Sequence, residues 1–145
     1  MDSINELTSQ GTDRLDLAEI CCHPESELSK TCETLGGKAM RLSIGTGYDL
    51  LTRDGTQSAR NELVTRSPRY NWFSTPCTAW CSWQRINIAK ATELARNKLK
   101  GRQHTSRRLY RNALYLASQL MALGGYIAWE WPRSCDAWRL PEPPG

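Results

Sequence analysis

The chain has 145 residues, which is about the size of one ordinary domain and leaves no room for two full enzymes. Hydrophobic residues make up 39% and charged residues 23%, so the composition excludes the disordered, collagen-like and membrane classes. No segment holds the roughly 18 to 20 apolar residues that span a bilayer. The first twenty residues lack the basic head and apolar run of a signal peptide. We therefore expect an intracellular protein that does not enter a membrane.

The six cysteines could form three disulfides, but the reducing compartment expected here favours free thiols. Cys21, Cys22 and His23 lie together, and Cys77 and Cys81 form an isolated pair. Neither spacing matches the paired ligands of a common zinc site. We therefore expect thiols and no bound metal.

The net charge of +4 is unevenly distributed along the chain. Residues 1–35 hold eight acidic against two basic residues, whereas residues 85–111 hold nine basic against one acidic. Such a basic segment can contact the phosphates of a nucleic acid, although a run of charge is also typical of a solvated helix face. The candidate nucleic-acid-binding residues are Arg85, Lys98, Lys100, Arg102, Arg107, Arg108 and Arg111.

The first half of the chain predicts two strands and two helices. Residues 1–13 are polar and aperiodic, which predicts a flexible leader before the first ordered element. Thr52 or Asp54 can cap the second helix, and Ser67-Pro68 ends it because the residue before a proline avoids the helical conformation. In chain order, hydrophobic spacing predicts a strand at 15–20, a helix at 25–35, a strand at 38–44 and a helix ending near residue 66.

The second half places two reactive side chains directly after predicted strands. An extended aromatic run at 69–74 leads to Cys77, and a short apolar run at 126–129 leads to Glu130. Between them, residues 85–100 are typical of one helix, and apolar residues at steps of four and three predict a second helix over 109–123. The chain then reaches a proline-rich end at residues 141–145.

Strands that alternate with helices predict an α/β fold, with an open, mostly parallel, Rossmann-like sheet and helices on both faces, over residues 14–140. Ligands in such sheets bind beyond the carboxyl ends of the strands, where the strand order reverses. Three polar segments follow predicted strand ends: residues 21–26, Pro76-Cys77 and Glu130. We expect a functional site there.

Cys77 is a candidate nucleophile because a following helix and a nearby cation favour the thiolate form of cysteine. Glu130, between two tryptophans, is a candidate proton donor. Structural alternatives remain open: a buried inert cysteine, and a carboxylate paired with an arginine such as Arg133. The six tryptophans could stack on unpaired bases or fill the core.

Taken in order, four motifs resemble the catalytic core of the DNA cytosine-5 methyltransferases. Residues 15–21 look like the first strand and cofactor loop, and residues 47–52 like the glycine-aspartate cofactor motif. Pro76-Cys77 looks like the proline-cysteine nucleophile loop, and Glu130 like the glutamate of the Glu-Asn-Val motif. The resemblance covers about residues 14–132. The pattern at 72–77 is also similar to methyltransferase-like segments of retroelement polyproteins.

The resemblance implies S-adenosylmethionine as methyl donor and a cytosine rotated out of the duplex into the pocket. The basic segment at 85–111 would then contact the phosphate backbone of the DNA. Cys77 would attack ring carbon 6, and Glu130 would bind or protonate ring nitrogen 3, so that carbon 5 accepts the methyl group. The residues that the resemblance assigns to the cofactor are Glu19, Cys21, Cys22, Asp49 and Pro76.

The later motifs of that family have no counterpart here, so we expect a sheet truncated relative to a full methyltransferase domain. The chain would then be a fragment, a degenerate relative or one module of a longer polyprotein. An unpaired sheet edge would favour a further chain segment that completes the sheet. Two other functions stay open: a noncatalytic nucleic-acid-binding module, and an interaction domain whose cysteines and tryptophans only fill the core.

Overall fold

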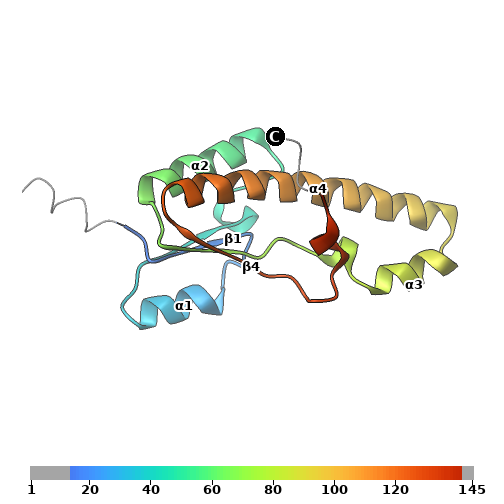
Figure 1. Cartoon of the computed structure of the whole chain (residues 1–145), viewed down its shortest axis with the longest axis horizontal. Helices are drawn as coiled ribbons and strands as arrows, with labels where there is room; N and C mark the ends of the chain where they lie inside the picture. Colours follow the sequence, from blue (N-terminus) through green and yellow to red (C-terminus); the bar gives the residue numbers. More distant parts are fainter. Residues whose placement is uncertain (1–13, 142–145) are drawn as a thin grey trace, which may run out of the picture.

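The computed structural model describes residues 14–141, and the predicted leader at 1–13 and most of the proline-rich end lie outside that range. Four strands and four helices make up the fold (Figure 1). No helix within the described range is both long and apolar enough to cross a membrane. The elements are β1 (Leu17–Ile20), α1 (Glu27–Thr34), β2 (Ala39–Leu42), α2 (Arg53–Arg66), β3 (Tyr70–Phe73), α3 (Trp83–Lys90), α4 (Glu93–Ala122) and β4 (Tyr126–Trp129).

The four strands form one sheet in the order β2-β1-β3-β4, and every pairing is parallel. Helices connect the strands and cover both faces: α2 and α4 lie on one side of the sheet and α1 on the other (Figure 1). This arrangement confirms the predicted α/β fold with a parallel sheet and flanking helices. The strand order reverses between β1 and β3, because β2 lies on one side of β1 and the later strands lie on the other.

Alternating side chains of the strands divide the sheet into two unlike faces. Ala18, Ile20, Leu42 and Phe73 point toward α2 and α4, and they form the main core with Leu63 and with the buried residues in the second half of α4. The opposite face carries Leu17 and Trp72, and α1 packs against its β1 and β2 side. The main core therefore lies between the sheet and the pair α2 and α4.

The predicted strands are confirmed as elements: the first three are shorter than predicted, and the fourth has the predicted bounds, 126–129. The strand predicted at 38–44 ends at Leu42, because residues 44–46 form a 3₁₀ turn that a left-handed Gly47 closes. Of the two predicted caps of α2, the structure shows Thr52: its side chain accepts a hydrogen bond from the Gly55 N–H at 3.0 Å. Ser67 ends that helix in the left-handed conformation, just before Pro68.

The two helices predicted at 85–100 and 109–123 have the wrong boundary. The chain breaks at Ala91, whose ψ of 149° is extended, and a single 30-residue helix then runs over Glu93–Ala122. Thr92 starts it by accepting a hydrogen bond from the Ala95 N–H at 3.2 Å. The polar stretch between the two predicted helices is helical throughout, and Gly101 inside it does not interrupt the helix. A single glycine in a helix lowers its stability but can be tolerated.

A second, smaller core lies beyond the end of the sheet. Trp80 and Leu99 pack there with Trp131 and Cys135, and the Trp131 indole N–H donates to the Thr75 carbonyl at 2.7 Å. Leu99 belongs to the first half of α4, whereas Leu116 and Leu120 of the same helix lie in the main core. The helix α4 therefore joins the two cores.

Candidate functional site

The carboxyl ends of the four strands form one edge of the sheet. Ile20 pairs in register with Leu42 and Phe73, and Phe73 pairs with Trp129, so the segments that follow these residues leave the sheet side by side. This edge is where the sequence analysis expected a site, and the structure brings the predicted segments to it.

A cavity of about 420 Å³ lies at this edge, over the β1 and β2 ends. It is formed by the loop after β1, the loop between β2 and α2, Pro76 from the loop after β3, and Leu109 from α4. Its volume is in the range of small-molecule sites. Four of the five predicted cofactor residues line it, from three separate loops: Cys21, Cys22, Asp49 and Pro76.

The loop after β1 turns at Cys21, whose φ is +62°. That left-handed conformation is costly for a residue with a Cβ atom and is the one that favours glycine. The Cys21 N–H donates to the Leu42 carbonyl at 2.8 Å, so the sheet pairing itself fixes the start of the turn. The loop therefore has the backbone of a glycine-type turn without containing a glycine.

Glycines allow two close approaches around the cavity. A Cβ atom on Gly45 would lie 2.6 Å from the Pro24 ring, so Gly45 lets the β1 and β2 loops meet. A Cβ atom on Gly55 would lie 2.1 Å from the Asp49 carbonyl oxygen, so Gly55 lets α2 begin directly against the Asp49 backbone. Both contacts hold the cavity wall in place.

Asp49 provides the cavity with a carboxylate. Its Oδ1 accepts a hydrogen bond from the Leu51 N–H at 2.9 Å, and its carbonyl accepts one from the Thr52 hydroxyl at 2.8 Å. The carboxylate is thus oriented by the turn that leads into α2, and apolar side chains such as Leu50 and Leu109 surround it. An acceptor among apolar walls suits a ligand that has both an apolar surface and hydrogen-bond donors.

The two thiols of the cavity are protonated at neutral pH. Burial raises the pKa of Cys21 to about 12, with a smaller contribution from the neighbouring Cys22. Burial and then the charge of Glu19 raise the pKa of Cys22 to about 11. Since the thiolate is the reactive form, neither side chain acts as a nucleophile in this environment.

Glu19 does not line this cavity but is buried beside it, with 2% of its surface exposed. Its Oε1 accepts from the Ser26 hydroxyl at 2.7 Å, and its Oε2 accepts from the Ser29 N–H at 2.9 Å and from the Ser29 hydroxyl. Ser29 lies in the first turn of α1, so Glu19 satisfies the start of that helix. Its bonds are those of a structural residue.

Glu130 lies on the other side of the β1 loop, in a cavity of about 330 Å³ that Glu19, Cys21 and Cys22 also line. Its Oε2 accepts hydrogen bonds from the Trp72 indole at 3.3 Å and the Ser74 hydroxyl at 3.2 Å. Among residues 14–141 it has no ion pair, so the predicted alternative of an arginine partner does not describe its contacts. The side chain is exposed and held by two neutral donors.

Cys77 lies in neither of these two cavities. It precedes a 3₁₀ turn at Thr78–Trp80 and packs, partly buried, against the second core. The Cys135 sulfur lies 4.0 Å from the Cys77 carbonyl oxygen. The segments that carry Cys77 and Glu130 leave neighbouring strands, but the two side chains have separate surroundings.

The predicted nucleic-acid-binding residues are all exposed, and the structure separates them by their contacts. Arg85 is bound to Asp136 by two hydrogen bonds, one of them 2.9 Å long, and Arg107 lies over the Trp80 ring at 4.9 Å from its centroid. Arg108 donates to the Leu51 carbonyl at 3.2 Å. The remaining four project from α4 without a hydrogen bond or ion pair inside the described range: Lys98, Lys100, Arg102 and Arg111.

Two features of this part of the chain were not predicted from the sequence. The first is an arginine-lined cavity between α2 and α4. Over residues 14–141, no three cysteine, histidine or carboxylate side chains gather as metal ligands would. Arg53 lines the arginine-lined cavity and was not singled out because it is isolated in the sequence, outside the basic segment. Its position at the start of α2 is the signal that could have identified it.

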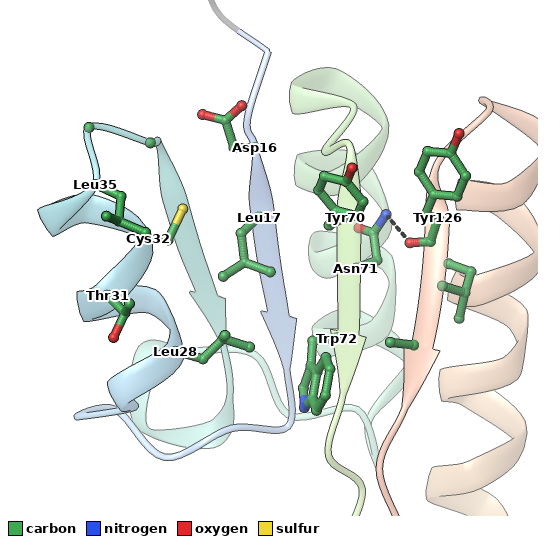
Figure 2. A pocket seen from close by; sticks show the side chains of 14 residues that line it. Asp16, Leu17, Leu28, Thr31, Cys32, Leu35, Tyr70, Asn71, Trp72 and Tyr126 are labelled. Carbon is green, nitrogen blue, oxygen red and sulfur yellow. Dashed lines mark hydrogen bonds between the residues drawn. The ribbon is translucent and has the colours of Figure 1, made fainter.

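The second unpredicted feature is an apolar groove on the α1 side of the sheet, with a volume of about 670 Å³ (Figure 2). Leu28 of α1 and Leu35, directly after that helix, form one wall, and Tyr70, Trp72 and Tyr126 of β3 and β4 lie across from it. Tyr70 and Tyr126 stack with ring centroids 5.4 Å apart. Because α1 covers only part of this face, apolar side chains stay exposed there, as for Leu35 at 82%.

Comparison with known proteins gives no matching family, no similar curated protein and no similar solved structure. The assignment of a function therefore depends on the geometry described above.

Proposed function

We propose that this chain is a Rossmann-like, S-adenosylmethionine-binding, methyltransferase-like domain that acts on cytosine in nucleic acid. One observation carries the proposal: Cys21, Cys22, Asp49 and Pro76, assigned to the cofactor from sequence motifs alone, line one cavity. The cavity lies at the carboxyl edge of a parallel sheet, next to the reversal of strand order, where ligands of such sheets bind.

The residues of this cavity fit a nucleoside-derived cofactor. Leu50, Leu109 and Tyr48 offer apolar surface to an adenine ring, and the Asp49 carboxylate offers an acceptor to an amino or hydroxyl group. The glycine-type turn at Cys21 brings main chain to the cavity wall, as a close approach to a cofactor needs. When bound, S-adenosylmethionine supplies an electrophilic methyl group.

In the proposed reaction the protein provides a nucleophile and a hydrogen-bonding carboxyl group. The Cys77 thiolate would add to carbon 6 of cytosine, and Glu130 would hold ring nitrogen 3, where negative charge develops. Carbon 5 would then take the methyl group and lose its proton to solvent, and the bond between Cys77 and carbon 6 would break, which releases the thiolate and the methylated base. Ser74 and Trp72 already orient the Glu130 carboxylate. Because the Cys77 side chain packs against the second core, its loop would have to turn toward Glu130 before both could contact one base.

Cofactor binding is the first test, by isothermal titration of the protein with S-adenosylmethionine. Asp49→Asn keeps an oxygen for the Leu51 N–H but removes the charge, so we expect binding about tenfold weaker than in the wild type. Asp54→Asn, in the first turn of α2 and outside the cavity, is the matched control and should bind as the wild type does. An absence of binding heat at millimolar cofactor would exclude the proposal.

A noncatalytic nucleic-acid-binding module is the second candidate, and the exposed basic residues of α4 favour it. The two candidates differ in their dependence on Cys77. Methyl transfer to a cytosine-containing oligonucleotide should be lost in Cys77→Ser, while oligonucleotide binding that weakens steeply with salt should persist in that variant. Binding by the wild type without any methyl transfer would favour the noncatalytic module.

A further inference from the structure

The arginine-lined cavity between α2 and α4 has the composition of an anion site. Its volume is about 440 Å³, and none of its lining residues is acidic. Arg53 and Thr56 come from the first turn of α2, and Arg108, Arg111 and Asn112 come from the middle of α4. Three guanidinium groups therefore face one space from two helices.

Contacts within the protein hold part of this site in place. The Asn112 amide donates to the Leu50 carbonyl at 2.6 Å, and Arg108 donates to the Leu51 carbonyl at 3.2 Å. These bonds attach the start of α2 to α4 and fix the Arg108 side chain. Within the described range, Arg53 and Arg111 have no hydrogen bond or ion pair. Their donors are available to a ligand.

Three positive charges in one cavity repel each other unless an anion lies among them. The amino end of α2 adds its own partial positive charge, and the nearest acidic residue of that turn, Asp54, does not line the cavity. Guanidinium groups bind phosphate oxygens in pairs, and the Thr56, Gln57 and Asn112 side chains supply neutral polar groups beside them.

We infer that this cavity binds a phosphate group, and that the phosphate is one of a nucleic-acid backbone; the second part rests on the proposed nucleic-acid substrate. Leu51 lines both this cavity and the cofactor cavity, so the two sites adjoin. One stripe of α4 carries four basic residues, spaced four, seven and four positions apart: Arg96, Lys100, Arg107 and Arg111. A strand along that stripe would reach the cavity.

The test measures binding of a fluorescent oligonucleotide by anisotropy at several salt concentrations. Arg53→Gln and Arg111→Gln should each weaken binding about tenfold and lower the salt dependence by about one phosphate contact, whatever the base sequence. Arg69→Gln is the matched control, because it removes the same charge from the opposite edge of the sheet, before β3. All three side chains are exposed, so the variants should fold, as circular dichroism can verify.

Inorganic phosphate is the second probe, with the amide NMR signals of residues 53–57 as the readout. Saturable shifts that Arg53→Gln abolishes support a phosphate site even if the wild type binds no oligonucleotide. That combination would reject the proposed nucleic-acid substrate and assign the site to a free phosphate compound. If phosphate causes no saturable shift and both arginine variants bind the oligonucleotide like the wild type, the inference is overturned.

Discussion

Cys21 combines a strained backbone with a buried thiol. Its φ of +62° could not be predicted, because cysteine has no preference for the left-handed region and no glycine marks the turn. The position of the residue was predictable, since it follows directly after an apolar strand. Tertiary pairing with Leu42, 21 residues further along the chain, is what holds the turn. Local sequence thus located this part of the site without revealing its conformation.

The buried thiol makes stability dependent on pH. The pKa of Cys21 rises from 9.0 to about 12 on burial, so above pH 9 the unfolded chain releases a proton that the folded chain retains. The folded state binds more protons there, and its stability must therefore fall as the pH rises from about 9 to about 12. Between pH 8 and pH 10 the wild type should lose about 1 kcal/mol more unfolding free energy than Cys21→Ala does.

Urea denaturation at both pH values measures this difference. Comparison of the two proteins cancels the titration of groups that they share, such as lysines and tyrosines. Parallel losses in the wild type and in Cys21→Ala would mean that the Cys21 thiol is ionised as easily in the folded protein as in the unfolded one.

Glu19 shows why a residue can be correctly placed and still have another role. The motif resemblance assigned it to the cofactor, and it lies at the predicted strand end. Its carboxylate, however, bonds to Ser26 and Ser29 at the start of α1. A sequence shows that a carboxylate lies near the end of a strand, but the partner of that carboxylate depends on how the next helix returns to the sheet.

At the scale of elements, all four strands were predictable and the longest helix was not. Each strand is a short apolar run that ends in a polar or glycine-containing segment, which is a strong local signal. The basic stretch between residues 93 and 109 has few apolar residues, because half of α4 has no sheet to pack against. Hydrophobic spacing therefore stopped short of the true start of the helix.

Thr92 defines that start, and its removal should be measurable. Thr92→Ala deletes the side-chain acceptor of the Ala95 N–H, so we expect a loss of about 1 kcal/mol in the free energy of unfolding. Thr105→Ala is the matched control within the same helix; it removes an exposed hydroxyl and should be neutral or slightly stabilising. Equal effects of the two substitutions in urea denaturation would argue against a helix boundary at Thr92.

At the scale of the whole molecule, the sequence predicted the sheet edge at which the candidate cavity lies, but only part of the residues that line it. Four of the five predicted cofactor residues line one cavity, because parallel strands bring their following loops to one edge. Cys77 and Glu130 do not share a cavity, because the segment with Trp131 and Cys135 packs over Cys77 and forms a second core. That packing joins residues 56 and 58 positions apart and has no local signature in the chain.

Because one helix joins two separate cores, we expect amides near the second core and amides near the main core to differ in their protection from hydrogen exchange. Leu99 is 4% exposed in the second core, so Leu99→Ala should lower the opening free energy of amides in the first half of α4 by about 2 to 4 kcal/mol. Amides of the sheet should keep their protection. Leu116→Ala, in the main core, should lower the protection of both groups, and equal profiles for the two variants would indicate one cooperative unit.

The length of α4 also determines how the molecule moves in solution. Thirty helical residues extend about 45 Å, while a compact chain of this size has a radius of gyration of about 15 Å. The helix lies along the longest axis of the protein (Figure 1). Rotational diffusion is therefore anisotropic: rotation about the long axis is fast, and end-over-end tumbling is slow. The N–H bonds of α4 lie parallel to the long axis and reorient only by the slow tumbling, so they should relax with higher R2/R1 ratios than N–H bonds that lie across that axis.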